Sequence, residues 1–305
     1  MQILKTIADM RQATTAARLA SNAPIGLVPT MGALHEGHLS LVRAASQQCG
    51  TVVVSIFVNP TQFAPGEDLD RYPRTLEADL ALLEQEGVDL VFVPSAREMY
   101  PNGIAATIVS THVEVPEISD RLDGLSRPGH FRAVATVVAK LFHIVGPDLA
   151  FFGAKDAVQV AVLRAMVRDL DFPLRIVVCP TVRDADGLAL SSRNSFLTPQ
   201  ERTHALTLSR ALETARLIAS HGSPTAEALR EAMLSLLHGD LGVRVDYAEV
   251  VHPDTLEPLA HIRDGALLAV AAWVGETRLI DNLLLSPPTL PSPPTLKPAR
   301  TEAHA

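Results

Sequence analysis

The sequence predicts an α/β protein in which a doubly wound domain with a parallel sheet precedes a smaller α+β domain. Two observations support this prediction. Short apolar runs typical of buried strands alternate with amphipathic stretches long enough for helices, a pattern that produces parallel sheets covered by helices on both faces. After Arg193 the alternation stops, and two helical stretches are followed by three strand-like segments.

The expected elements of the first domain follow one another along the chain. Its strands are predicted at Ile25–Pro29, Thr51–Val58, Asp89–Val93, Leu149–Phe152 and Leu174–Cys179. Its helices are predicted at Leu39–Gln48, Leu76–Gln85, Val134–Val145 and Ala157–Asp169. In a sheet of this kind ligands bind beyond the carboxyl ends of the strands, so the loops that follow the strands are where a functional site is expected.

The second domain begins with a well-marked helix. Thr198, Pro199 and Glu201 supply an N-cap, a first-turn proline and a capping-box acid, and the helix is expected to run toward Gly222. The remaining elements are a helix at Thr225–Leu237 and strands at Val243–Val251, Ala266–Val274 and Thr277–Leu284, with Gly275 and Glu276 as a hairpin turn between the last two strands.

The predicted domain limits are residues 1–184 for the first domain and 185–285 for the second. From residue 286 the chain continues as a proline-rich, polar segment, SPPTLPSPPTLKP. Such a composition buries too little apolar surface to offset the entropy of ordering, so residues 286–305 are predicted to be a disordered tail.

Composition excludes several classes of function. A formal net charge of -8 argues against a broad nucleic-acid-binding surface. No apolar run approaches the ~20 residues of a membrane span, and the two cysteines, Cys49 and Cys179, suggest neither a disulfide framework nor a zinc site. We therefore expect a cytoplasmic protein that binds neither membranes nor nucleic acid. The P-loop, GxGxxG and GxSxG motifs do not occur.

The first candidate loop, PTMGALHEGH at Pro29–His38, lies between a predicted strand and a helix expected to start near His38. Gly32 and Gly37 allow the main chain to approach a ligand closely, and a helix N-terminus offers free N–H groups to phosphate. His35 and His38 can contact the same triphosphate as hydrogen-bond donors and, if protonated, offset its charge. The alternative is a glycine turn with two surface histidines.

Two further segments offer polar groups for a small acid. FVNPTQF, at Phe57–Phe63, presents the neutral amides Asn59 and Gln62 after a strand, although for this loop taken alone a capped strand end is the favoured interpretation. In SRPGHF, Arg127 and Arg132 lie close to a helix start, where they either meet anionic groups or remain solvated. These residues are weaker candidates than the first loop.

The last two candidate loops suit phosphate oxygens. In FFGAKDAVQ, Lys155 follows the turn at Gly153, and Gln159 lies about one helical turn further on. In ADGLALSSRNSFL, the hydroxyls of Ser191 and Ser192 stand next to the guanidinium of Arg193. A surface lysine and an ordinary polar loop before a helix are the respective alternatives.

Taken together and in order, PTMGALHEGH, FVNPTQF, the DLDRYPRT run at Asp68–Thr75, GHFRAVATVV, FFGAKD and DGLALSSRN closely resemble the pantothenate synthetase family. The resemblance covers the chain from about Met1 to Leu285. It implies a Rossmann-like nucleotidyltransferase domain, a smaller C-terminal lid domain and a cytoplasmic homodimer. The implied activity is that of a carbon–nitrogen ligase, which condenses ATP-activated (R)-pantoate with β-alanine through a pantoyl-adenylate and releases AMP and pyrophosphate.

The resemblance also implies roles for individual residues. The residues expected to bind ATP are Met31, Gly32, Ala33, Leu34, His35, Glu36, Gly37, His38, Gly153, Ala154, Lys155, Asp156, Val182, Leu190, Ser191, Ser192 and Arg193. The residues expected to stabilise charge during catalysis are His38, His35, Lys155, Ser191, Ser192 and Arg193, with His38 at the position of a histidine often described as a proton donor. Gln62 and Gln159 are expected to bind pantoate and Gln62 also β-alanine, with Tyr72, Asn59, His130 and Arg127 as weaker assignments. Mg²⁺ is expected to accompany ATP, and no protein ligand for it is indicated.

The chain departs from the family pattern FGEKDYQQ at Ala154, Ala157 and Val158. These changes place nucleotide packing in question. Two alternatives to the ligase remain, the first because it would share the HxGH loop and the second because of these changes. One is a nucleotidylyltransferase of the same superfamily that lacks the amide-forming step. The other is a nucleotide-binding protein of the same fold without catalytic activity.

Overall fold

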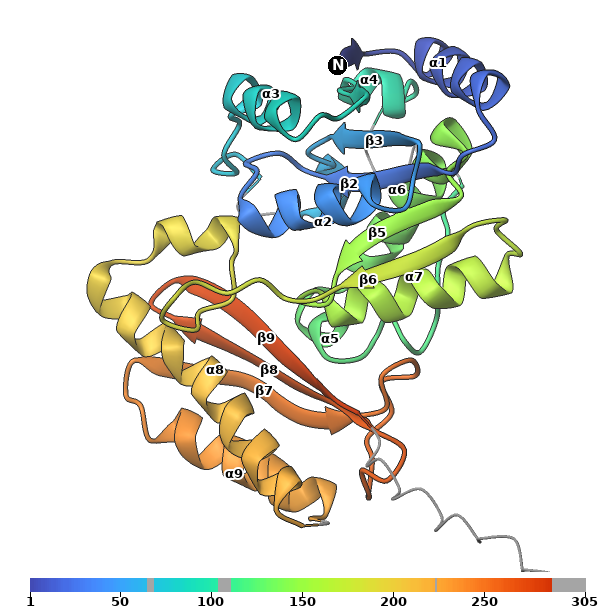
Figure 1. Ribbon diagram of the computed structural model, residues 1–305. Coiled ribbons are helices and arrows are strands. Elements are labelled where there is room, and N and C mark those ends of the chain that lie inside the picture. The colour runs from blue at the N-terminus through green and yellow to red at the C-terminus, as the bar shows by residue number, and fades with distance from the viewer. Residues whose placement is uncertain (65–68, 104–110, 223, 287–305) are drawn as a thin grey trace, which may run out of the picture.

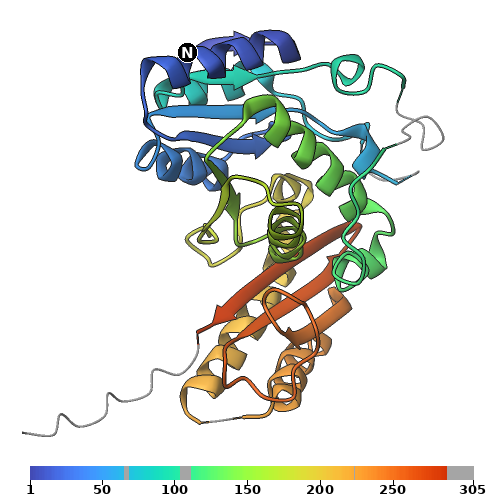
Figure 2. The same ribbon diagram turned by 90° about the vertical axis from the view of Figure 1, so that its right-hand side faces the viewer.

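The protein, described here by a computed structural model, forms two lobes stacked one above the other (Figures 1 and 2). The structure describes residues 1–64, 69–103, 111–222 and 224–286. The large lobe contains strands β1 to β6 with the helices α1 to α7, and the small lobe contains α8, α9 and strands β7 to β9.

The large lobe is built on a six-stranded sheet in which every paired neighbour is parallel. Its spatial order is β1-β4-β3-β2-β5-β6. The strands are β1 (Gln2–Leu4), β2 (Ile25–Thr30), β3 (Thr51–Ile56), β4 (Leu90–Phe92), β5 (Leu149–Gly153) and β6 (Arg175–Cys179). The predicted parallel sheet is confirmed, with one short strand, β1, added at its edge.

Helices cover both faces of this sheet because successive side chains of a strand point to opposite faces. Leu27 of β2 joins a core with helices α1, α6 and α7, whereas the next residue, Val28, joins a core with α2 and α3. These helices are α1 (Ile7–Ala20), α2 (Glu36–Ser46), α3 (Leu76–Gln85), α6 (His130–Val145) and α7 (Ala157–Asp169). Short helical turns occur at η1 (Pro60–Gln62), α4 (Ala96–Met99), α5 (Asp123–Ser126) and η2 (Ser192–Phe196).

The strand order places a topological switch point between β2 and β5. From β2 the chain proceeds through β3 and β4 toward one edge of the sheet, and β5 and β6 then extend the other edge. Helices that leave two such strands lie on opposite faces, so a crevice opens beyond the carboxyl ends at that point. The loops after Thr30 and Gly153 therefore border the natural ligand position of this fold.

The small lobe is a three-stranded antiparallel sheet, β7 (Val243–Val251), β8 (Ala266–Val274) and β9 (Thr277–Leu285), packed against α8 (Pro199–Ser220) and α9 (Ala226–His238). Thr198 and Glu201 form the predicted capping box. Val274 pairs with Thr277, so Gly275 and Glu276 form a two-residue hairpin turn, and Gly275 has a positive φ of 56°. Leu267 and Ala269 of β8 join the core of the large lobe, and this shared apolar contact links the two lobes.

Element boundaries differ from the predictions at a few places. Helix α2 begins at Glu36 and not near His38, because the ring of His35 caps the helix two residues before the predicted start. Helix α6 begins at His130, earlier than the predicted Val134. The N-terminal elements β1 and α1 have no counterpart in the prediction. A three-residue strand such as β1 carries too little periodicity to be recognised.

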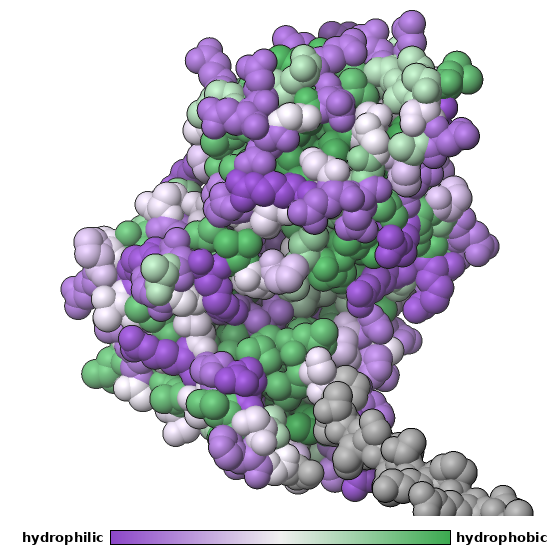
Figure 3. Space-filling view, viewed as in Figure 1, coloured by the Kyte–Doolittle hydropathy of each residue, from purple (hydrophilic) through white to green (hydrophobic). Residues whose placement is uncertain are grey.

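In the space-filling view, hydrophilic residues predominate over the helices, and apolar residues form a patch on the small lobe beside α8 (Figure 3). Within the described ranges, no helix is both long and apolar enough to cross a membrane. The predicted proline-rich tail lies, apart from Ser286, outside the described residues, as does Asp68 of the DLDRYPRT run. The domain limits at residues 184 and 285 remain predictions.

Candidate active site

The loop after β2 is held in place by a buried carboxylate. Asp79 of α3 is only 2% exposed, and it accepts hydrogen bonds from the main-chain nitrogens of Ala33 at 3.0 Å and Leu34 at 2.9 Å. Gly32 turns the chain with a φ of 83°, and a Cβ atom there would lie 2.9 Å from Asp79 Oδ2. A glycine is therefore required where the loop crosses the carboxylate.

The two histidines of this loop lie against each other at the start of α2. Their ring centroids are 4.1 Å apart. His35 Nδ1 accepts a hydrogen bond from Gly37 N at 3.1 Å, and His38 Nδ1 faces the main-chain nitrogen of His35 at 3.4 Å. With both Nδ1 atoms acting as acceptors, each neutral ring carries its proton on Nε2, where it can donate to a ligand.

Electrostatics keeps both rings neutral. Burial lowers the pKa of His38 to about 3, and the neighbouring His35 adds to this effect. Burial also lowers the pKa of His35, with Lys155 as the second cause. Of the two protonation states considered from the sequence, the neutral one is present near pH 7, so these histidines act as hydrogen-bond donors and not as cations.

The loop after β3 presents one of its two predicted amides and buries the other. Asn59 is 1% exposed and donates through Nδ2 to Gln62 Oε1 at 3.1 Å. The main-chain oxygen of Gln62 lies 2.9 Å from Nδ1 of His130 and accepts a hydrogen bond from Arg127 at 3.4 Å. Asn59, Arg127 and His130 thus contact Gln62. Asn59 is buried in this position, and its assignment to a ligand stays a prediction.

The loop after β5 is supported from the small lobe. Asn282 of β9 donates to the main-chain oxygens of Ala154 at 3.0 Å and Lys155 at 2.7 Å. Lys155 Nζ lies 3.5 Å from Asp156 Oδ1, and 18% of the lysine side chain is exposed. The ammonium group thus has a defined position at the carboxyl edge of the sheet.

The loop after β6 brings the serine–arginine motif to the same edge. Leu190 N donates to Val182 O at 3.0 Å, and the Leu190 side chain lies 3.8 Å from the position of a Cβ atom on Gly37. Ser191 caps η2 by accepting a hydrogen bond from Arg193 N at 3.3 Å. Its hydroxyl proton remains available to a ligand because capping uses only the oxygen lone pair.

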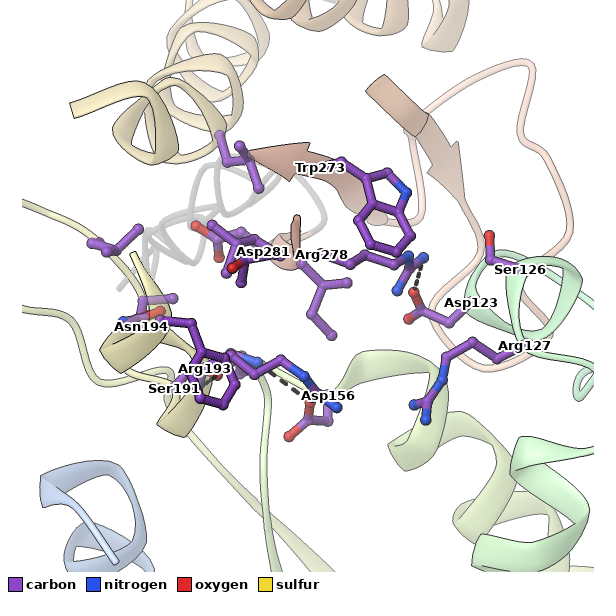
Figure 4. A pocket seen from close by; sticks show the side chains of 18 of the residues that line it. Asp123, Ser126, Arg127, Asp156, Ser191, Arg193, Asn194, Trp273, Arg278 and Asp281 are labelled. Atoms are coloured by element: carbon purple, nitrogen blue, oxygen red, sulfur yellow. Dashed lines mark hydrogen bonds and ion pairs between the residues drawn. The ribbon is translucent and has the colours of Figure 1, made fainter. Parts of the chain in front are cut away.

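A cavity of about 740 Å³ lies between the two lobes (Figure 4). The predicted residues that line it are Lys155, Asp156, Gln159, Ser191 and Arg193, together with Arg127 and His130. The small lobe contributes Trp273, Arg278 and Asp281. In Figure 4 Arg193 and Asp156 lie on one side of the cavity, opposite Trp273 and Arg278, while Arg278 pairs with Asp123 at 2.7 Å.

The other predicted residues lie beside this cavity and do not line it; they are the Met31–His38 loop, Gln62, Gly153, Ala154, Val182, Leu190 and Ser192. Two observations show that residues of this second set lie next to residues of the cavity wall or of the loops that carry it. Lys155 and Asp156 both act on the pKa of His35 and of His38, and Leu190 packs next to Gly37. The carboxyl ends of β2, β5 and β6 therefore converge, as the fold requires.

Comparison with known protein families identifies this arrangement. Residues 2–284 match the family described as Pantoate-beta-alanine ligase. This chain belongs to the pantoate-beta-alanine ligase family. It is 58% identical to a pantothenate synthetase of Acidobacterium capsulatum, over 93% of this chain and 97% of that protein, and 55% identical to one of Koribacter versatilis, over 93% and 96%.

Solved structures agree with this family membership. The crystal structure of pantothenate synthetase from Thermus thermophilus has a TM-score of 0.86 and 48% sequence identity, covering 94% of this chain and 100% of that one. The pantoate-beta-alanine ligase from Francisella tularensis, crystallised with beta-gamma ATP and beta-alanine, has a TM-score of 0.74 and 35% identity, covering 93% and 97%. The fold predicted from sequence is the fold of the family.

The three departures from the family motif lie outside the cavity of this ligase-family protein. Val158 is 3% exposed in the core of the large lobe, and Ala157 packs against the same core. Ala154 acts through its main chain, which donates to Cys179 O at 2.8 Å and accepts from Asn282. The side chains present at these three positions therefore form no part of the cavity wall.

Three residues that support the site are absent from the sequence prediction. Asp79 is a lone carboxylate on the apolar face of LEADLALL, a signal that could have identified it. Asn282 lies in the strand TRLIDNLLL, where a polar residue among apolar ones indicates a buried hydrogen-bond partner but does not identify it. Tyr100, which bonds Asn59, carries no sequence signal at all.

Proposed function

We propose that this protein catalyses the ATP-dependent condensation of (R)-pantoate with β-alanine to give pantothenate, AMP and pyrophosphate. Membership of the pantoate-beta-alanine ligase family supports the reaction. The observation that carries the proposal in the structure is the convergence of Lys155, Gln159, Ser191 and Arg193, which follow β5 and β6, on one cavity between the two lobes.

ATP is assigned to the loops that follow β2, β5 and β6. The start of α2 lies at this edge with its capping box closed on itself, and the neutral rings of His35 and His38 offer Nε2–H donors for phosphate oxygens. Lys155 and Arg193 supply the positive charge, and Ser191 and Ser192 supply hydroxyl donors. These roles follow from the chemistry of the groups and from their common position.

In the first step a carboxylate oxygen of pantoate attacks the α-phosphorus of ATP, and pyrophosphate departs. Positive charge and N–H donors at this position stabilise the negative charge that develops on the phosphate oxygens. In the second step the amine of β-alanine attacks the acyl carbonyl carbon of the adenylate and AMP departs. Gln62 and Gln159 are assigned to pantoate, and Gln62 also to β-alanine.

Mg²⁺ is assigned to the ATP that enters the site. Among the described residues no group of three or more His, Cys, Asp or Glu side chains is placed to hold a metal. A magnesium ion bound to phosphate oxygens needs only one or two protein carboxylates, and Asp156, which lines the cavity beside Lys155, fits that requirement. When bound, the ion would offset charge on the phosphate oxygens.

The proposal extends to the assembly and location of the protein. We assign it a homodimeric state and a cytoplasmic location, as the family resemblance implies. Sedimentation of the purified full chain tests the first assignment, with a mass of twice 32.7 kDa expected.

Incubation of the full chain with ATP, Mg²⁺, (R)-pantoate and β-alanine tests the activity. Equal amounts of pantothenate, AMP and pyrophosphate are expected, and no AMP should form when pantoate is omitted. A stable adenylylated product without amide would show a nucleotidylyltransferase instead. Nucleotide binding without AMP formation would show a protein that binds ATP but does not catalyse the reaction.

A further inference from the structure

The side-chain amide of Asn59 is buried next to Gln62, and both its oxygen and its nitrogen take part in hydrogen bonds. Asn59 Oδ1 accepts hydrogen bonds from the hydroxyls of Tyr100 and Thr61, each at 2.9 Å. The two hydroxyl oxygens are 3.4 Å apart, as expected for two donors aimed at one acceptor. Since both hydroxyls occupy the oxygen of Asn59, its NH₂ group is the side that faces Gln62.

This arrangement determines which end of the Gln62 amide is turned outward. Gln62 Oε1 accepts from Asn59 Nδ2 at 3.1 Å, so Gln62 Nε2 points away from the buried network. Its neighbour there is Met31 Sδ, at 3.1 Å. A thioether sulfur is a weak hydrogen-bond acceptor, so a carboxylate or hydroxyl oxygen that replaces it forms a stronger bond with the same N–H group.

The opposite orientation of Gln62 conflicts with its surroundings. Turning the amide over would place Oε1 against the sulfur of Met31, where two acceptors meet, and NH₂ against the NH₂ of Asn59, where two donors meet. Asn59 could relieve the second conflict only by turning its own amide over. Its NH₂ group would then face the hydroxyls of Tyr100 and Thr61, and both bonds that these hydroxyls donate to Asn59 Oδ1 would be lost.

The surroundings of Tyr100 hold its hydroxyl in place as a hydrogen-bond donor. It is 6% exposed, and the ammonium of Lys140 lies 5.5 Å from the centroid of its ring. Burial raises the pKa of its phenol, which keeps the hydroxyl protonated at neutral pH. Tyr100 does not line the cavity between the lobes, and its hydroxyl reaches Gln62 through the hydrogen bond to Asn59.

We propose that Tyr100, together with Thr61, is a positioning residue that acts through Asn59 to hold the Gln62 amide with its N–H donors toward the substrate. The inference rests on the proposed function, in which Gln62 contacts pantoate. It also defines what this subsite selects: an acceptor oxygen of a hydroxy acid or carboxylate, and not an ammonium group, because no amide oxygen is presented there.

Tyr100→Phe tests the proposal, since it removes one hydroxyl and retains the ring. We expect the KM for pantoate to rise roughly three- to tenfold, the effect of one hydrogen bond, with the KM for ATP unchanged within about twofold. Thr61→Val should also raise the KM for pantoate, whereas Thr61→Ser, which keeps the hydroxyl, should have the wild-type KM. The double variant Tyr100→Phe/Thr61→Val, in which Asn59 is free to turn over, should exceed the product of the two single effects.

Thr14→Val is the matched control, because Thr14 is a buried hydroxyl on α1 that bonds only the main-chain oxygens of Met10 and Arg11. It should leave both KM values unchanged whatever it does to stability. An unchanged pantoate KM in Tyr100→Phe, or equal rises for pantoate and ATP, would overturn the positioning role while wild-type protein still makes pantothenate. Wild-type protein that makes none would overturn the proposed function itself, and the two failures are thereby distinguished.

Discussion

Replacing Asp79 by asparagine tests how the loop after β2 is held. The carboxylate accepts from Ala33 N, Leu34 N and the hydroxyl of Thr75, the last at 3.1 Å. Asparagine has nearly the same shape and only one acceptor oxygen. Its best orientation keeps the bonds of Leu34 and Thr75 on that oxygen and turns an NH₂ group toward the N–H of Ala33.

The size of the effect follows from these bonds. A hydrogen bond to a charged acceptor contributes about 1.5–3 kcal/mol, and a buried donor left without an acceptor costs about 1–3 kcal/mol. Loss of the Ala33 bond alone therefore predicts a cost of about 2 kcal/mol. If the substitution shifts the loop in the folded protein, the same free energy is lost from the interaction with ATP. The kcat/KM for ATP then falls roughly 30-fold, since 1.4 kcal/mol corresponds to tenfold.

Steady-state pyrophosphate release and urea unfolding together measure this effect. The matched control is Glu77→Gln, an exposed carboxylate in the first turn of the same helix, which should change neither quantity appreciably. Asp79→Asn with both wild-type kcat/KM for ATP and wild-type unfolding free energy would refute the reasoning. Loss of stability with full activity would show that Asp79 anchors α3 and not the loop.

Three further predictions concern the remaining parts of the site. His38→Ala and Lys155→Ala should each slow AMP formation at least about a hundredfold in quenched-flow assays, as expected for groups that stabilise developing charge, and near-normal turnover in either variant would contradict its role. Because the folded pKa of His38 is about 3, below its ordinary 6.5, the unfolded chain binds more protons between these values. Its contribution to stability is complete above pH 6.5 and declines by up to about 1.4 kcal/mol per pH unit as the pH falls toward 3. In urea titrations the unfolding free energy of His38→Gln should therefore fall less steeply with decreasing pH than that of the wild type. Asn282→Ala should raise the KM for ATP about tenfold while the protein stays folded, since both hydrogen bonds that Asn282 donates to the Lys155 loop are lost, and an unchanged KM would rule out support from β9.

Much of the fold could be predicted because local patterns and final structure agree. Helices α3 and α7 and strands β7 and β8 begin and end where periodicity places them. The capping box at Thr198 and Glu201 is a local signal, so its prediction needed no tertiary information. The start of α2 was missed because His35, an unusual N-cap residue, caps it with its ring.

The candidate site, like the fold, was predictable from sequence only in part. Its loops were identifiable from sequence because polar and glycine residues follow apolar strands at the edge where a parallel sheet binds ligands. The supports of those loops come from elsewhere: Asp79 from α3, Asn282 from β9 and Tyr100 from the turn after α4. Such contacts join residues far apart in the chain, and no local pattern specifies them.

The sequence by itself determined the class of fold, the positions of the binding loops and, through the combined motifs, the family. Only the tertiary structure decided the state of the side chains in those loops. Burial makes His35 and His38 neutral donors, and a hidden amide turns the N–H groups of Gln62 outward. Charge state and amide orientation depend on which atoms surround a group, and that is decided when distant segments pack together.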